Sequence, residues 1–182
     1  MKYLIVGLGN IGAEYAETRH NVGFMAVDCL AEKYCFSPFK AKFDGLIADG
    51  SIGGEKVLLL KPQTYMNLSG NSVVKAASFY KIPPQNIVVI HDDMDLLPGQ
   101  VKAKKGGGAG GHNGSKSIDA HMGSDYNRIR IGVGHPQGRG EEVVNHVLSR
   151  FSKRENMPVL FAGGVSAMAN RLGQLLKGRK QA

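Results

Sequence analysis

Several features that identify common classes of protein are missing from this sequence. No apolar run approaches the ~20 residues that a helix needs to cross a membrane. The segment from Met1 to Gly7 is short and lacks a cleavage site, which predicts a first strand rather than a secretory signal. Cys29 and Cys35 are too few for a disulfide framework, and no Cys/His cluster has zinc-finger spacing. We therefore expect a cytoplasmic protein with no membrane association.

The motifs of covalent and nucleotide-dependent enzymes are absent as well. The sequence has no Gly-x-Ser-x-Gly elbow, and neither cysteine stands in a nucleophile motif. The glycine run at 106–111 lacks the Lys-Ser/Thr ending of a P-loop. A hydrolase without an evident nucleophile would rely on direct attack by water.

One glycine motif does match a nucleotide-binding pattern. Residues 7–12 satisfy GxGxxG after a predicted strand. A dinucleotide site requires a helix that opens directly after the glycines and an acidic residue at the end of a second strand. Here the next helix begins only near Asn21, and Glu32, at about the right distance, falls inside it. These glycines indicate instead a tight turn with a close backbone approach.

The residues that are present predict one folded domain over residues 1–182. Of the 182 residues, 42% are hydrophobic, which allows a sizeable core. The net charge of +8 favours a polyanionic partner, nucleic acid first. The basic residues gather at 102–105, at 128–130 and at 177–180. A solvated surface is the alternative for each cluster, and we prefer it for the last one.

Strand and helix patterns alternate along the chain, which predicts an α/β fold. We expect strands at 2–7, 43–52, 56–60, 86–90, 101–105 and 127–133. We expect helices from 21 to about 34, at 69–80, 115–122 and 141–148, and from about 159 to 176. The connections imply a mixed sheet with helices on both faces. Ligands bind such sheets at the carboxyl ends of strands, where Gly7, His91 and the glycine run fall.

His20 is the candidate for a general base, and the alternative, more common for a lone histidine, is a loop residue that only bonds its neighbours. It lies in a polar stretch just before a helix, and an unperturbed histidine can accept a proton near neutral pH. A carboxylate would have to orient its ring. Asp92, just past a buried strand, is the preferred partner, and Asp93 is the alternative because adjacent strand residues point to opposite sides. The same aspartates suggest a Mg²⁺ site, but two neighbours in an extended segment do not easily face one ion.

Asparagine recurs in the predicted loops, and an uncharged amide can both donate and accept hydrogen bonds. Such groups could hold an ester and a peptide backbone, and one could donate to a developing oxyanion. Each could equally cap a turn or a helix. The three are Asn10, Asn67 and Asn113.

Five ordered blocks of this sequence resemble the bacterial peptidyl-tRNA hydrolases. They span residues 7–23, 61–70, 91–95, 106–114 and 128–136, and the match extends to about Leu148. The first contains Thr18-Arg19-His20-Asn21-Val22-Gly23. The resemblance implies a monomeric, three-layer α/β/α fold with a mixed central sheet. It implies hydrolysis of the ester between a peptide and the 3′ ribose of tRNA, with no metal or organic cofactor.

Residue roles follow from the same resemblance. His20 would be the general base and Asp92 its orienter, while Asn10, Asn67 and Asn113 would bind the peptide and the reacting carbonyl. The peptide cleft would be lined by Met66 and His112, with Tyr15 as a neighbour. The tRNA acceptor end and its 5′ phosphate would be held by Lys102, Lys104 and Arg130.

The chain departs from the family pattern in two places. Ile11 stands where the family usually has proline, which leaves the backbone before Gly12 less constrained. Beyond Leu148 the match fades, and the C-terminal helical region is shorter than usual and interrupted by Pro158.

Two other functions compete with this one. A noncatalytic RNA-binding protein would use the same basic clusters but gives no reason for His20, Asp92 and three loop asparagines. A metal-dependent phosphoesterase would be built on Asp92, Asp93 and Asp95, and it would lose activity in EDTA.

Overall fold

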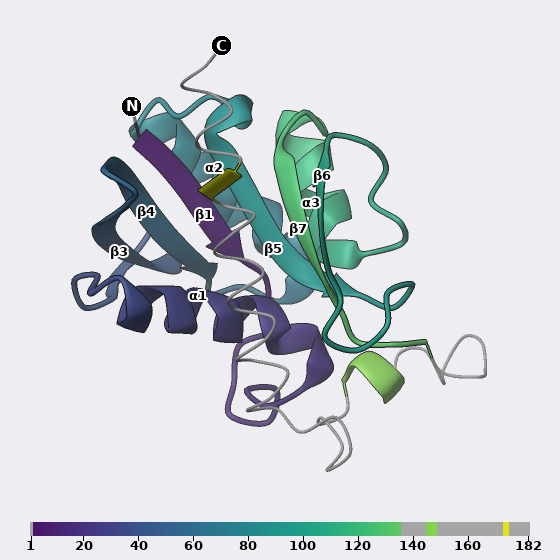
Figure 1. The fold of residues 1–182 in the computed structure, drawn as a ribbon. Coiled ribbons are helices and arrows are strands. Elements are labelled where there is room, and N and C mark those ends of the chain that lie inside the picture. Colours follow the sequence, from purple (N-terminus) through teal and green to yellow (C-terminus); the bar gives the residue numbers. More distant parts are fainter. Residues whose placement is uncertain (1, 136–144, 149–172, 175–182) are drawn as a thin grey trace.

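The computed structural model describes residues 2–135, 145–148 and 173–174, and these include a seven-stranded mixed sheet (Figure 1). The strand order is β2-β3-β4-β1-β5-β7-β6. The strands are β1 (Lys2–Gly7), β2 (Lys40–Lys42), β3 (Gly45–Ile52), β4 (Glu55–Pro62), β5 (Ile87–Asp93), β6 (Val101–Lys105) and β7 (Asn127–Gly132). Strands β4, β1, β5 and β7 run parallel, whereas β2, β3 and β6 pair antiparallel with their neighbours.

The helices cover both faces of this sheet. They are α1 (Val22–Lys33), α2 (Ser69–Phe79) and α3 (Asn113–Met122), with short 3₁₀ turns η1 (Arg19–Asn21), η2 (Met66–Leu68) and η3 (Pro84–Asn86). Figure 1 shows α1 on one side of the sheet and α2 and α3 on the other. Among the described residues, no helix has the length and apolar character to cross a lipid bilayer.

Two separate cores result from the alternation of side chains along the central strands. On the α1 face, Ile5 and Ile90 pack with Leu30. On the opposite face, Val6 and Val89 pack in the cluster that includes residues of α2 and α3. Because β1 and β5 are buried on both faces, they form the continuous apolar runs seen in the sequence. The expected three-layer α/β architecture is confirmed.

Most predicted elements lie where the sequence placed them. The hairpin β3–β4 turns at Gly53 and Gly54, both with positive φ, and pairs Ile52 with Glu55. Strand β5 is longer than expected, because pairing with β7 continues to Asp93. The short, exposed edge strand β2 was missed. The helix expected at 141–148 is described only at 145–148, where 145–147 are helical. Apart from residues 173–174, which are helical, the last predicted helix lies outside the described residues.

Two glycines bring the start of α1 against the ends of the central strands. A Cβ on Gly23 would lie 2.5 Å from the Ile90 carbonyl oxygen and 2.5 Å from the Leu8 nitrogen, and a Cβ on Gly7 would lie 2.2 Å from the Gly23 carbonyl oxygen. Both positions therefore require glycine. The GxGxxG segment ends in a loop rather than opening a helix, as the sequence argument against a dinucleotide site expected.

Candidate active site

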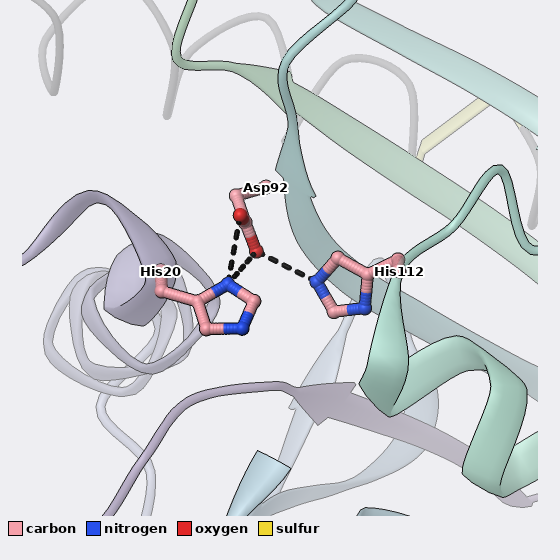
Figure 2. A group of neighbouring side chains, drawn as sticks. All are labelled: His20, Asp92 and His112. Atoms are coloured by element: carbon pink, nitrogen blue, oxygen red, sulfur yellow. Dashed lines mark hydrogen bonds and ion pairs between the residues drawn. The ribbon is translucent and has the colours of Figure 1, made fainter. Parts of the chain in front are cut away.

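Three polar side chains from three elements meet at the carboxyl end of β5 (Figure 2). Asp92 lies on β5, His20 on η1, and His112 is the residue that caps the start of α3. Along β5 the side chains of Val88 and Ile90 face α1, so the alternation turns Asp92 to the same side, toward the start of that helix. His112 approaches from the α3 side, so both outer layers contribute to the cluster.

The hydrogen bonds in this cluster fix the protonation of both rings. The backbone N–H of Ser115 donates to His112 Nδ1 (3.2 Å), so the proton of neutral His112 is on Nε2, which donates to Asp92 Oδ1 (2.7 Å). His20 Nδ1 lies 2.9 Å from Oδ1 and 2.8 Å from Oδ2 of the same carboxylate, so it too carries a proton. His20 Nε2 is then left with a lone pair. No described residue is hydrogen-bonded to that atom.

The electrostatics favour a charged carboxylate at Asp92. Burial alone raises the pKa of this carboxyl, but the contacts with His112 and His20 outweigh burial and hold the pKa well below its usual range. Asp92 also binds His20, two residues before α1, and His112, the N-cap of α3, and helix N-termini stabilise negative charge. Asp92 is therefore an anion at neutral pH and can stabilise positive charge on His20.

His91 lies directly beneath this cluster on the other side of β5. Its Nδ1–H donates to the Asp92 carbonyl oxygen (2.7 Å), and its ring lies 4.6 Å from that of His112. Burial lowers the pKa of His91 to about 3, and the His112 ring adds to the effect. His91 is therefore neutral under working conditions and adds no second positive charge to the site.

Asp93, the alternative partner for His20, points to the opposite side of the sheet. Its Oδ2 lies 3.4 Å from Arg130 Nη1, and its Oδ1 accepts the Asp95 amide N–H. Asp92 and Asp93 do not face a common point, which removes the geometry that a metal site on this acidic run needs.

A different group, His20, Asp92 and His112, has ligand atoms within 4.8 Å of one another. Two of those atoms, His20 Nδ1 and His112 Nε2, carry protons that already bind the carboxylate. To bind a cation, His112 would have to move its proton to Nδ1, where it would meet the Ser115 N–H. The hydrogen-bonded form is the one that this arrangement supports.

Asn10 is held beside the cluster by contacts to its backbone and its side chain. The Asn21 side chain accepts from the Asn10 N–H (2.8 Å) and donates to the Asn10 carbonyl (2.9 Å). The Met66 N–H donates to Asn10 Oδ1 (2.7 Å). The amide NH₂ group of Asn10 donates to no described residue. It is thus a fixed donor available to a ligand.

The other two asparagines are exposed, on elements that pack together. Asn67 lies on η2, and Asn113 begins α3 next to Gly114. A Cβ on Gly114 would lie 2.6 Å from Met66 Sδ, so the two elements touch at this glycine. Met66, expected to line a cleft, is buried in the core cluster of the α2 and α3 face. The backbone N–H of Met66 donates to the Asn10 side chain, while the Met66 side chain packs against Gly114.

Tyr15 lies apart from these contacts in the loop before η1. Its backbone carbonyl accepts from the Thr18 hydroxyl and is part of the turn that leads to His20. Its side chain is half-buried, and no described residue is hydrogen-bonded to it.

The expected tRNA-binding residues line up on the edge of the sheet beyond β5. Lys102 and Lys104 are exposed on β6, and Lys102 pairs directly with Arg130 on β7. Arg130 in turn pairs with His91 in the β5–β7 register. Directly opposed strand residues share a face, so these cations lie on the α3 side, near the carboxyl end of β5.

Arg128 does not belong to this exposed set, although the sequence grouped it with Arg130. It is 1% exposed, and its Nη2 donates to Asp119 Oδ1 (3.0 Å) and to the Gly107 carbonyl (3.0 Å). Arg128 therefore joins the glycine run to α3. The contacts of Asn21 and His91 were not predicted from the sequence. Their positions next to His20 and Asp92 were the only signal.

The chain is similar to known proteins over nearly its whole length. The model of the family described as peptidyl-tRNA hydrolase matches residues 4–182. The chain is 53% identical over 185 residues to a peptidyl-tRNA hydrolase of Rhodospirillum centenum, covering 94% of this chain and 81% of that protein. For the Agrobacterium fabrum protein of the same name, the identity is 52% over 178 residues, covering 96% and 72%. The crystal structure of peptidyl-tRNA hydrolase from Acinetobacter baumannii superposes with a TM-score of 0.90 at 44% identity, covering 98% of this chain and 90% of that one.

Proposed function

The chain belongs to the peptidyl-tRNA hydrolase family, and on this premise we propose that it hydrolyses the ester between a peptide and the 3′ ribose of tRNA, with His20 as general base. The resemblance drawn from the five sequence blocks is thereby confirmed. The single observation that carries the role of His20 is its Nδ1–H bond to buried Asp92, which leaves Nε2 unprotonated.

The reaction follows from this tautomer. His20 Nε2 takes a proton from water as the water oxygen attacks the ester carbonyl carbon. Asp92 balances the positive charge that forms on the ring. When the tetrahedral intermediate collapses, the ester C–O bond breaks, and His20 returns the proton to the 3′ oxygen. The products are a peptide with a free carboxylate and a tRNA with a free 3′ hydroxyl. Positioned base catalysis of this kind contributes roughly 10²–10⁴-fold.

The neighbouring groups have complementary roles in the proposal. The Asn10 amide NH₂ donates to the developing oxyanion, since its other contacts are already taken. Asn67 and Asn113 are exposed and can bind the peptide backbone, with Met66 and His112 behind them and Tyr15 at the margin. The tRNA acceptor end lies along Lys102, Lys104 and Arg130. We further propose that residues 1–182 act as one domain and as a cytoplasmic monomer.

The test is release of tRNA from purified N-acylaminoacyl-tRNA in the presence of EDTA. His20→Ala should abolish turnover while leaving tRNA binding intact. His121→Ala is the matched control, because that histidine of α3 is exposed, lies beside Gly70 and, among the described residues, hydrogen-bonds only to the Ser117 carbonyl. Near wild-type turnover in His20→Ala would overturn the assignment of the base. Binding without turnover in the wild type would favour the RNA-binding alternative, and loss of turnover in EDTA would favour a metal-dependent enzyme.

A further inference from the structure

We propose that Asn21 is a positioning residue for this reaction: it holds Asn10 so that the Asn10 amide meets the same carbonyl that His20 activates water to attack. The inference rests on the proposed function. It assigns a role to a residue that the sequence placed only at the start of a helix.

The Asn21 side chain is committed to one neighbour. It is 1% exposed, and both of its polar atoms bind the Asn10 backbone, Oδ1 to the N–H (2.8 Å) and Nδ2 to the carbonyl (2.9 Å). Although Asn21 stands at the start of α1, its side chain makes no capping hydrogen bond to the helix. Its amide therefore serves the loop after β1 rather than the helix.

This contact determines where the Asn10 amide points. With its N–H and carbonyl held by Asn21 and its Oδ1 held by the Met66 N–H, Asn10 has one hydrogen-bonding group left, its NH₂. Without the Asn21 contacts, the backbone of Asn10 would no longer be held, and the direction of its NH₂ group would no longer be fixed. Ile11, which follows Asn10, provides no proline ring to restrain the same loop.

Asn21 is also bonded covalently to His20. The dipeptide His20-Asn21 therefore holds two groups at once: His20 binds Asp92 on β5, and Asn21 binds Asn10 after β1. The 3₁₀ turn η1 fixes the direction of one side chain relative to the other. The turn η1 thus sets the positions of both the base, His20, and the oxyanion donor, Asn10. The distance between these two groups depends on Asn21.

Asparagine suits this position because the contact needs one donor and one acceptor. Asn21→Asp keeps the size of the side chain but opposes a carboxylate oxygen to the Asn10 carbonyl. Asn21→Ser shortens the side chain and introduces no charge. The matched control is Asn127→Ser: Asn127 is also buried and donates to backbone carbonyls, but it lies at the start of β7, away from the cluster.

The experiment is a double-mutant cycle on kcat with N-acylaminoacyl-tRNA. Displacement of a catalytic group by about 1 Å can cost roughly 10²-fold, so we expect Asn21→Asp and Asn21→Ser to lower kcat by about 10- to 100-fold with little change in KM. In an Asn10→Ala background, either change should have almost no further effect on kcat. Asn127→Ser should lower the thermal midpoint and leave kcat unchanged.

Two results would overturn the inference: wild-type kcat in the Asn21 variants, or full multiplicative losses in the Asn10→Ala background. If Asn21→Asp does not fold, Asn21→Ser carries the cycle. If neither variant folds, Asn21 is a structural residue and the inference is wrong. An active His20→Ala enzyme would instead overturn the proposed function, so the two failures are distinguishable.

Discussion

Replacing Asp92 with asparagine should inactivate the enzyme through the tautomer of His20. The carboxylate accepts from two donors: His112 Nε2–H at 2.7 Å from Oδ1, and His20 Nδ1–H at 2.9 Å from Oδ1 and 2.8 Å from Oδ2. An amide has only one oxygen, so one histidine must face an NH₂ group. His112 cannot change its tautomer, because the Ser115 N–H requires a lone pair on its Nδ1. His20 is not constrained in this way.

In the Asp92→Asn variant, the oxygen of the new amide should therefore stay with His112, and its NH₂ should face His20. An NH₂ group in place of Oδ2, which lies 2.8 Å from His20 Nδ1, favours the tautomer in which Nδ1 accepts. The ring proton then moves to Nε2, and the lone pair that activates water is lost. Loss of the base lowers kcat by roughly 10²–10⁴-fold, while KM changes little because no group proposed to bind substrate is altered. Steady-state kinetics on N-acylaminoacyl-tRNA measure both parameters.

Asp93→Asn is the matched control, because Asp93 is the adjacent residue and faces the other side of the sheet. Its kcat should remain close to that of the wild type. If Asp92→Asn kept wild-type kcat, the tautomer argument would be refuted. If Asp93→Asn lost activity instead, the alternative orienter considered from the sequence would be correct.

The other predictions concern tRNA binding, packing and pH. Alanine at Lys102, Lys104 and Arg130 should weaken tRNA binding and reduce the slope of log binding constant against log salt concentration by roughly 0.7–0.9 per lost phosphate contact. Binding titrations at several salt concentrations test this, with Lys56→Ala on the other side of the sheet as control. Gly23→Ala should lower the free energy of unfolding in urea by about 1–3 kcal/mol or more, because its Cβ would lie 2.5 Å from the Ile90 carbonyl oxygen; unchanged stability would contradict that packing. His91 should make the folded protein sensitive to acid. In the unfolded chain this histidine takes up a proton near pH 6.5, whereas its pKa in the folded protein is about 3. The contribution of His91 to the free energy of unfolding is therefore full above pH 6.5 and falls by up to about 1.4 kcal/mol per pH unit as the pH drops toward 3. His91→Asn should flatten this slope between pH 6.5 and 5, above the range in which Asp92 contributes, and an unchanged slope would show that another group is responsible.

Local patterns predicted most of the fold and the central pair of the site. The apolar runs of β1 and β5 and the Gly53-Gly54 turn are properties of neighbouring residues, and all lie where they were expected. From the sequence, Asp92 was the preferred partner of His20 because it follows a buried strand, and strand alternation left Asp93 as the alternative; the structure pairs His20 with Asp92. Strand β2 could not be predicted, because its three exposed residues carry no apolar pattern.

Two side chains show where a linear pattern is insufficient. Arg128 and Arg130 share a face of β7, yet only Arg128 lies under the glycine run, where it bonds to the Gly107 carbonyl. The loop that covers Arg128 is distant in the sequence, so the residues next to Arg128 do not indicate that it is buried. Asn21 stands at the cap position of α1, but its side chain binds the backbone of Asn10, because the loop after β1 brings Asn10 within its reach. In both cases the choice of partner depends on tertiary proximity.

The three-layer architecture brings two histidines to one carboxylate. His91, Asp92 and Asp93 are consecutive, but strand alternation sends Asp92 toward α1 and its two neighbours toward α3. At the carboxyl end of the strand, the Asp92 carboxylate is reached by His20 from one layer and by His112 from the other. A fold with helices on one face alone would supply only one of these histidines. In such a fold the carboxylate would be held from one side only, by His20. The second layer thus holds in place the carboxylate that we propose orients His20.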